Sequence, residues 1–285
     1  MMLIRYGYDI TIDSDAPLSM VVQMSVRPER QLDLRGVEAF STTPRVAYST
    51  FVDDFGNFCR RLSAPAGQFR MQQTAVIADS GLPEADFPDA QEMPIQSLPD
   101  DVLQFLLPSR YCDSDLLMDP AWQLFGQIPP GWGRVQAIMD WVHDHITFNY
   151  MDADATRTAS DALRQGKGVC RDFAHLAIGL CRALNIPARY VNAYLGDFGI
   201  VAPPDPMDFA ASVQVYLSGR WWHFDPRNNK RRIGRLPVGY GRDATDVALL
   251  SSFGQHRLVN FIVITDEIDA DGNLIPPMPR AEAAD

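Results

Sequence analysis

A cysteine at the start of a helix is the residue of this chain best suited to act as a nucleophile. Cys170 follows the segment Gly166-Lys167-Gly168-Val169 and precedes apolar residues spaced as in an amphipathic helix. The exposed N–H groups and the positive dipole end at a helix N-terminus favour a thiolate, the nucleophilic form of cysteine. The two glycines also allow the backbone to approach a ligand closely. The apolar positions are Phe173, Leu176, Ala177, Leu180, Cys181 and Leu184.

A structural role is the alternative for Cys170, because a free cysteine commonly behaves as a small buried apolar residue. Cys181 fits that role, since it falls on the apolar face of the same predicted helix. Cys170 instead opens the helix. We therefore interpret Cys170 as the nucleophile and Cys181 as a core residue.

The cysteine segment resembles the core of the bacterial transglutaminase-like superfamily, whose members are related to papain-type cysteine proteases. The resemblance rests on Gly-Lys-Gly-Val-Cys-Arg-Asp-Phe-Ala-His-Leu (166–176) and on Leu-Cys-Arg-Ala-Leu-Asn-Ile-Pro-Ala-Arg-Tyr-Val (180–191). It implies a Cys-His-Asp triad spread over three segments, with Cys170 as its first member. Arg-Trp-Trp-His-Phe-Asp-Pro-Arg-Asn-Asn (220–229) matches the third segment and makes Asp225 the residue that would orient the histidine. Tyr150 would line the cleft in such a protein, with a structural tyrosine as the alternative.

The second triad segment departs from the family pattern. The family's Asp-Phe-His begins here as Asp208 and Phe209, but Ala210 occupies the histidine position. Alanine cannot accept the thiol proton or protonate a leaving amine, so the general base is missing. Either the natural protein has lost its activity or the chain is an inactivated variant of an active enzyme. The retained Cys170 favours a recent or engineered loss, whereas Ser212, in place of a family aromatic, favours natural drift.

The five histidines of the chain offer poor substitutes for the missing base. His175 lies five residues after Cys170, roughly 140° around the same helix, and is expected to point elsewhere. His223 is two residues before Asp225 and shares its face of a strand, but nothing in the sequence brings it near Cys170. We interpret His175 as structural and keep His223 as a minor alternative. The remaining histidines, His143, His145 and His256, have no helpful spacing.

Composition predicts an ordinary globular protein of 285 residues with no nucleic-acid or membrane partner. The net charge is −11 and no basic run is present, which argues against nucleic acid and anionic membranes. No apolar run approaches the roughly 20 residues of a membrane span. The cysteines form no metal-ligand spacing with histidine, so a zinc site is not expected. The chemistry that the resemblance implies needs neither a metal nor a cofactor. The absence of a secretory signal at the N-terminus favours a reduced, cytoplasmic setting.

The order of predicted elements indicates an α+β protein with two domains. Alternating strands bounded by turn residues fill the first eighty residues, including a hairpin over 45–62, and predict an antiparallel β-sandwich. A proline-rich connection ends at about residue 108. Residues 109–285 then form the papain-like core, with helices predicted over 133–146, 160–165 and from Cys170. Strands follow over 188–195, 212–217, 221–225 and 258–265, and the tail after Pro276 is predicted to be disordered.

The resemblance implies attack by Cys170 on an amide carbonyl to give a thioester. Water resolves the thioester in a protease or amidase, and an amine resolves it in a transglutaminase. Hydrolysis of a peptide or protein substrate is the favoured reaction, with transamidation second. Because of Ala210, this chain is expected to be inactive as written, and a peptide-binding module without catalysis is the alternative. A purely structural partner in a larger complex is a further alternative, and the oligomeric state is left open.

Overall fold

The alternating segments near the N-terminus form long antiparallel strands. The computed structural model describes residues 1–200 and 207–277. Strand β1 (Met2–Ser14) pairs along its whole length with β6 (Gly67–Asp79). The predicted hairpin is confirmed as β4 (Tyr48–Val52) and β5 (Phe58–Ala64). Its turn is stabilised by Asp53, whose Oδ1 accepts the backbone N–H groups of Phe55 and Asn57.

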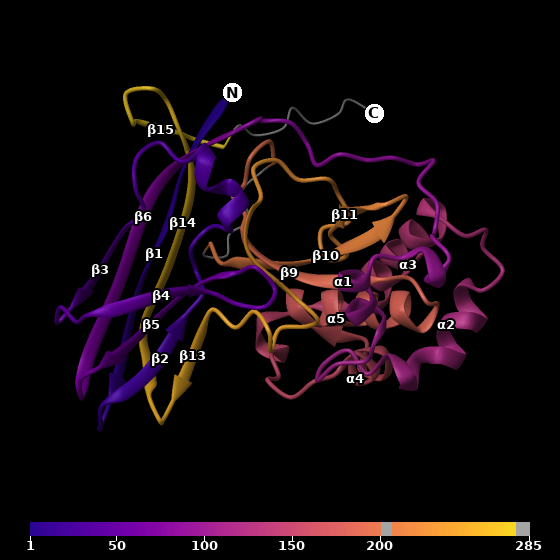
Figure 1. Ribbon diagram of the computed structural model, residues 1–285, viewed down its shortest axis with the longest axis horizontal. Coiled ribbons are helices and arrows are strands. Elements are labelled where there is room, and N and C mark those ends of the chain that lie inside the picture. The colour runs from indigo at the N-terminus through magenta and orange to yellow at the C-terminus, as the bar shows by residue number, and fades with distance from the viewer. Residues whose placement is uncertain (201–206, 278–285) are drawn as a thin grey trace.

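Two antiparallel sheets stack face to face and confirm the sandwich. Together with β2 (Leu18–Val22) and β3 (Ala39–Thr43), the strands have the orders β15-β14-β1-β6-β3 and β13-β2-β5-β4. Figure 1 shows the two sheets as one half of the molecule. Large side chains from both sheets, such as Ile12, Met20 and Phe69, are fully buried in their shared core.

The sandwich is completed by strands from the far end of the chain. They are β13 (Leu250–Phe253), β14 (Arg257–Ile268) and β15 (Leu274–Ile275). Strand β14 covers the predicted strand over 258–265 and pairs with β1 from Leu3 opposite Ile268 to Asp13 opposite Arg257. The chain therefore enters and leaves through the same sheet (Figure 1). The pairing of β14 with β1 was not indicated by the apolar pattern of residues 258–265. Nor was it indicated by the predicted division into domains at residue 108.

The other half of the molecule consists of helices packed on a second antiparallel sheet. The sheet has the order β11-β10-β9-β12, with β9 (Ala188–Tyr194), β10 (Phe209–Leu217), β11 (Arg220–Phe224) and β12 (Leu236–Gly241). The helices are α1 (Asp100–Leu103), α2 (Met118–Phe125), α3 (Trp132–His145), α4 (Ala159–Gln165) and α5 (Cys170–Ala183). A short parallel pair joins β7 (Thr147–Phe148) to β8 (Lys167–Gly168), directly before α5.

Helix α5 is the centre of this half. The sequence predicts an amphipathic helix, but every residue from Asp172 to Ala183 is buried. The sheet strands β9 and β10 cover one face, and α2, α3 and α4 cover the rest (Figure 1). Burial on all sides fixes the axis of α5, and with it the position of Cys170 at its first turn.

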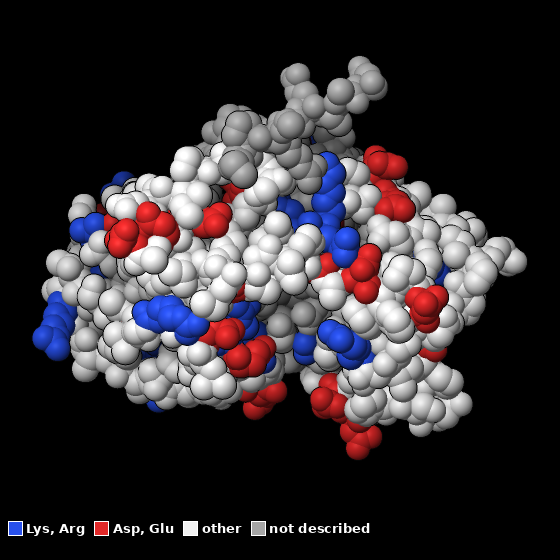
Figure 2. Space-filling model, turned by 90° about the horizontal axis from the view of Figure 1, so that it is seen from above, with Lys and Arg blue, Asp and Glu red and all other residues white. Residues whose placement is uncertain are grey.

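The surface carries charges of both signs. In the view of Figure 2, Lys and Arg side chains lie among Asp and Glu side chains and form no continuous basic area on that face. Among the helices of the described ranges 1–200 and 207–277, none has the length and apolar character needed to cross a membrane. The predicted disorder after Pro276 falls largely on residues 278–285, which lie outside the described residues.

Candidate active site

Cys170 is the first residue of α5, as the sequence predicts. The residue before it, Val169, has no side-chain acceptor, and its own N–H is bound by the carboxylate of Asp172 at 2.8 Å. The same carboxylate oxygen accepts a hydrogen bond from Arg157 at 3.0 Å, in a buried ion pair. These contacts hold the first turn of α5 in place. Cys170 is thus at the positive end of the helix dipole and is half-buried.

Glycine occupies positions 166 and 168 for structural reasons, and not for the close approach to a ligand that the sequence predicted. Gly166 ends α4 in a left-handed conformation, with φ of 62°. At Gly168, an added Cβ would lie 2.7 Å from the Asp172 Cβ. Gly168 therefore leaves room for the carboxylate that holds the start of α5.

Gly168→Ala is expected to displace Asp172 and with it the first turn of α5. Because the neighbour is a buried side chain with an ion-pair partner, we expect the free energy of unfolding to fall by about 1–3 kcal/mol, as for an overpacked core site. Urea unfolding measures the loss. Gly133→Ala serves as the control, since nothing lies within 4 Å of an added Cβ there. Equal stability of the two variants would contradict this role of Gly168.

A pocket of about 200 Å³ opens beside Cys170, and we call it the nucleophile pocket. The structure brings Tyr150, which was predicted to line the cleft, and the family segment Asp208 and Phe209 together with Cys170 and Ala210 in its wall. Phe209 and Ala210 begin β10, which places them next to the start of α5. The pocket is also lined by Phe148, Leu195, Asp197, Ile200, Met207, Arg227, Asn228 and Arg232. Residues 201–206, between β9 and β10 in the sequence, lie outside the described part of the chain.

Asp225 lies behind the wall of this pocket. It follows directly after β11, whose last paired residue, Phe224, is opposite Val213 of β10. Asn228 lines the pocket and donates to Asp225 through its backbone N–H and its Nδ2, at 2.9 and 2.8 Å. The register puts Ala210 three residues beyond Val213, so Ala210 and Asp225 are not directly opposite each other but offset along the strands.

A buried ion pair holds Asp225 from the other side. Arg235 donates to Asp225 Oδ2 at 2.6 Å and to Glu84 Oε1 at 2.5 Å. Burial alone would raise the pKa of Asp225, but the Arg235 guanidinium and the Asn228 hydrogen bonds lower it below its ordinary value. Asp225 is therefore an ionised, fixed carboxylate, as the orienting member of a triad must be.

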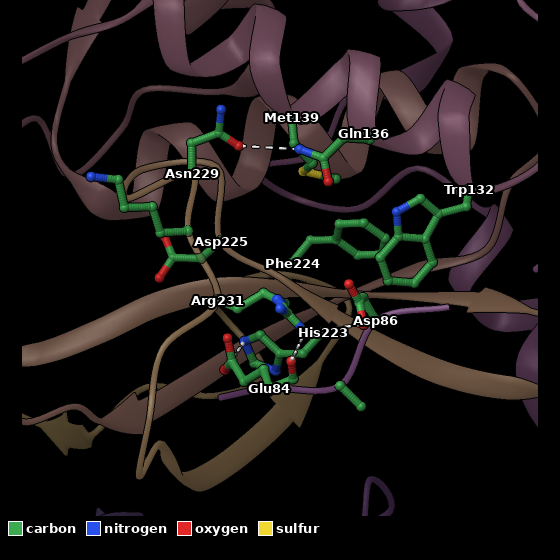
Figure 3. A pocket seen from close by; sticks show the side chains of 12 residues that line it. Glu84, Asp86, Trp132, Gln136, Met139, His223, Phe224, Asp225, Asn229 and Arg231 are labelled. Atoms are coloured by element: carbon green, nitrogen blue, oxygen red, sulfur yellow. Dashed lines mark hydrogen bonds and ion pairs between the residues drawn. The ribbon is translucent and has the colours of Figure 1, made fainter. Parts of the chain in front are cut away.

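His223 belongs to this network and not to the nucleophile pocket. Its Nε2 is 2.8 Å from Ser212 Oγ and 3.6 Å from Glu84 Oε1. Burial lowers the pKa of His223 to about 4. It lines a second pocket of about 280 Å³, in which Trp132 and Phe224 lie side by side (Figure 3). A role for His223 as substitute base is not supported by this position.

The remaining histidines also lie apart from Cys170. His175 is fully buried, stacks on Tyr111, and accepts a hydrogen bond from the Ala244 N–H at 3.2 Å. Burial lowers the pKa of His175 to about 3, so it is neutral. This agrees with the predicted structural role. His143, His145 and His256 do not line the nucleophile pocket.

The surroundings of Cys170 do not favour a thiolate in this chain. Burial raises the pKa of the thiol, and the Asp208 and Asp225 carboxylates act in the same direction. The Ala211 N–H and the Arg227 guanidinium oppose the increase without cancelling it. The lowering of the thiol pKa that the helix N-terminus was predicted to give is thus outweighed by burial and the two carboxylates. No imidazolium of the described residues stands beside the sulfur to offset them.

Four residues important to the site were not assigned a role from the sequence. Arg227 and Asn228 lie in the segment that identified Asp225, and their polar side chains so close to it were the available signal. Glu84 and Arg235 gave no signal, since they are 151 positions apart and meet only in the folded chain. Within residues 1–200 and 207–277, no group of three or more His, Cys, Asp or Glu could hold a metal ion.

Comparison with known proteins finds a matching family model, a similar solved structure and similar sequences. A family model described as the transglutaminase-like superfamily matches residues 123–226. A crystal structure of a "putative cysteine protease" from Cytophaga hutchinsonii superposes with a TM-score of 0.82 and 31% identity, over 96% of this chain and 93% of that one. An uncharacterized protein of Mycobacterium leprae is 26% identical over 80% of this chain and 83% of its own. A protein of Pyrococcus horikoshii is 32% identical over 41% of this chain and 36% of its own.

Proposed function

Since the chain belongs to the transglutaminase-like superfamily, we propose that it carries the site of a cysteine-dependent amide or peptide hydrolase and lacks the base at Ala210. The observation that carries the proposal is the nucleophile pocket, where Cys170 at the start of α5 and Ala210 at the start of β10 share one wall. Asp225 is fixed directly behind it. Two of the three triad positions are thus occupied by residues that suit their roles.

The reaction would proceed through a thioester. The Cys170 thiolate attacks the carbonyl carbon, the C–N bond breaks, and the amine leaves with a proton from the base. Water then attacks the thioester carbon, which releases the acid and returns the thiol. The backbone N–H of Cys170, in the first turn of α5, would donate to the developing oxyanion. Without a histidine at position 210, both proton transfers lack their carrier.

Hydrolysis leads over transamidation in this proposal. Both use the same thioester and differ in whether water or an amine resolves it. A nucleophile pocket of about 200 Å³ supports binding of a small part of a peptide or protein substrate. The free thiols, Cys59, Cys112, Cys170 and Cys181, support a reducing compartment such as the cytoplasm.

A binding role without catalysis is the second candidate. The observation that favours it is Ala210 together with the raised pKa of the Cys170 thiol. A pocket that keeps its shape but not its base would hold a peptide without cleaving it. This candidate predicts peptide affinity and no adduct on Cys170, even when the histidine is put back.

The pH dependence of Cys170 alkylation by iodoacetamide tests the proposal. Because the pKa of the thiol is raised, the neutral range lies below it, and the rate in the native chain should rise about tenfold with each pH unit there. In Ala210→His an imidazolium would stabilise the thiolate at lower pH. The rate should then be almost independent of pH across the neutral range.

Two variants control this experiment. Ala210→Asn adds a polar side chain without a base and should follow the native profile. Cys170→Ser reports alkylation at the three remaining cysteines, which are buried. Identical profiles for Ala210→His and Ala210→Asn would mean that position 210 does not face the thiol productively. The binding role would then be the better interpretation.

A further inference from the structure

A cleft of about 630 Å³ lies between the sandwich and the helical half, outside the nucleophile pocket. We call it the inter-sheet cleft. Its walls come from β1 and the chain after β2 on one side, from β9 and α5 on another, and from residues 244–261 as a cover. A volume of this size is typical of pockets that enclose small molecules.

The lining of the inter-sheet cleft is mainly apolar. Ile10, Met24 and Val247 form its buried surface, while Leu258 and Phe261 of β14 are 57% and 38% exposed at its edge. None of the residues that line it is Asp or Glu. The few polar side chains among them are Thr245, Ser251, His256, Asn192 and the tyrosines at 111 and 190.

Arg171 supplies the one permanent positive charge among the lining residues. Its guanidinium donates to the Asp154 carbonyl oxygen and lies 5.5 Å from the centre of the Tyr111 ring. No carboxylate of the described residues is within ion-pair distance of it, and its Nε is buried without a hydrogen-bond partner there. A buried donor of this kind is costly unless a ligand satisfies it.

Asn192 adds a second polar group, from strand β9. It is only 9% exposed, on the central strand β9. Its Nδ2 donates to the Val247 carbonyl oxygen at 3.4 Å, which is a weak hydrogen bond. Asn192 and Arg171 therefore offer two polar contacts in a cleft whose lining is mainly apolar.

We propose that the inter-sheet cleft binds a long-chain carboxylic acid, with its carboxylate on Arg171 and its hydrocarbon chain against β14 and residues 247–250. Charge complementarity selects an anionic head, because the lining has a guanidinium and no carboxylate. The apolar walls select a chain of methylenes over a peptide, whose successive amide groups would lose hydrogen bonds to water without replacement here. The proposal is independent of the activity at Cys170.

Binding of cis-parinaric acid, a fluorescent fatty acid, tests the proposal on the full chain. The acid should bind with enhanced fluorescence, and about tenfold more tightly than its methyl ester, since the uncharged ester forms no ion pair with the Arg171 guanidinium. Arg171→Met should abolish that preference and leave ester binding unchanged. Arg110→Met is the matched control, because Arg110 contacts the same Tyr111 ring at 4.8 Å but does not line the cleft.

A second variant tests where the hydrocarbon chain of the ligand lies. Ala248→Trp fills the cleft from its half-buried cover, and it should weaken the acid and the ester alike. Thermal melts confirm that each variant is folded. Absence of binding to the native chain would overturn the proposal. So would binding that neither Arg171→Met nor Ala248→Trp alters, since the acid would then occupy some other surface.

Discussion

Replacing Ala210 with histidine is expected to raise the rate of peptide amide cleavage by about 10²–10⁴-fold, the usual contribution of a positioned general acid–base. The pocket already holds Cys170 at a helix start, and Asp225 is ionised behind Asn228. An imidazole at position 210 would take the thiol proton and return it to the leaving amine. A pool of fluorogenic peptide amides measures the gain.

The products that Ala210→His forms also distinguish hydrolysis from transamidation. With a fluorescent primary amine present, a hydrolase still releases mainly the free acid, whereas a transglutaminase attaches the amine to the acyl group. Ala210→His with Cys170→Ser is the control and should show neither product. If Ala210→His is folded and still cleaves no faster than Ala210→Asn, the proposed hydrolase site is wrong.

Arg235→Met is expected to lower the free energy of unfolding by about 3–5 kcal/mol. Arg235 is 2% exposed and is shared by Asp225, which is 1% exposed, and Glu84, which is 15% exposed. The substitution leaves both carboxylates buried and unpaired, at a cost larger than the value of the ion pair itself. Urea unfolding at neutral pH measures the loss.

The pH dependence identifies the cause of that loss. The pKa values of Asp225 and Glu84 are held below their ordinary ranges, so the ion pairs stabilise the fold above those ranges and this contribution is lost as pH falls through the lowered values. In Arg235→Met the unpaired carboxylates should take up protons at higher pH. The difference from the native protein should therefore shrink as the solution is acidified.

Arg231→Met is the matched control. Arg231 pairs with Asp86 at 3.0 Å from the same segment, but both side chains are about half exposed. An exposed pair contributes about 0–1 kcal/mol, so this substitution should change stability little. Adding Glu84→Leu to Arg235→Met should restore part of the loss by removing one unpaired charge. An equal effect of Arg231→Met and Arg235→Met would contradict the role of the buried network.

The strands and helices of the chain were largely predictable from local pattern. The hairpin over 45–62 formed because its turn contains Asp53 and Gly56 between apolar runs. The burial of α5 on all sides from Asp172 to Ala183 was not predictable, because the same apolar spacing occurs in helices covered on one face and in helices covered on all faces. The true reason for Gly168 was also hidden, since it depends on where the Asp172 side chain turns.

The sequence by itself determined that Cys170 opens a helix and that position 210 holds no base, because both depend on residue identity and on neighbours within a few positions. Tertiary structure alone decided that β14 pairs with β1, that Glu84 and Arg235 secure Asp225, and that Arg171 enters an apolar cleft. These contacts join residues far apart in the chain. Their partners are selected by packing and by the need to pair buried charges, which no local pattern records.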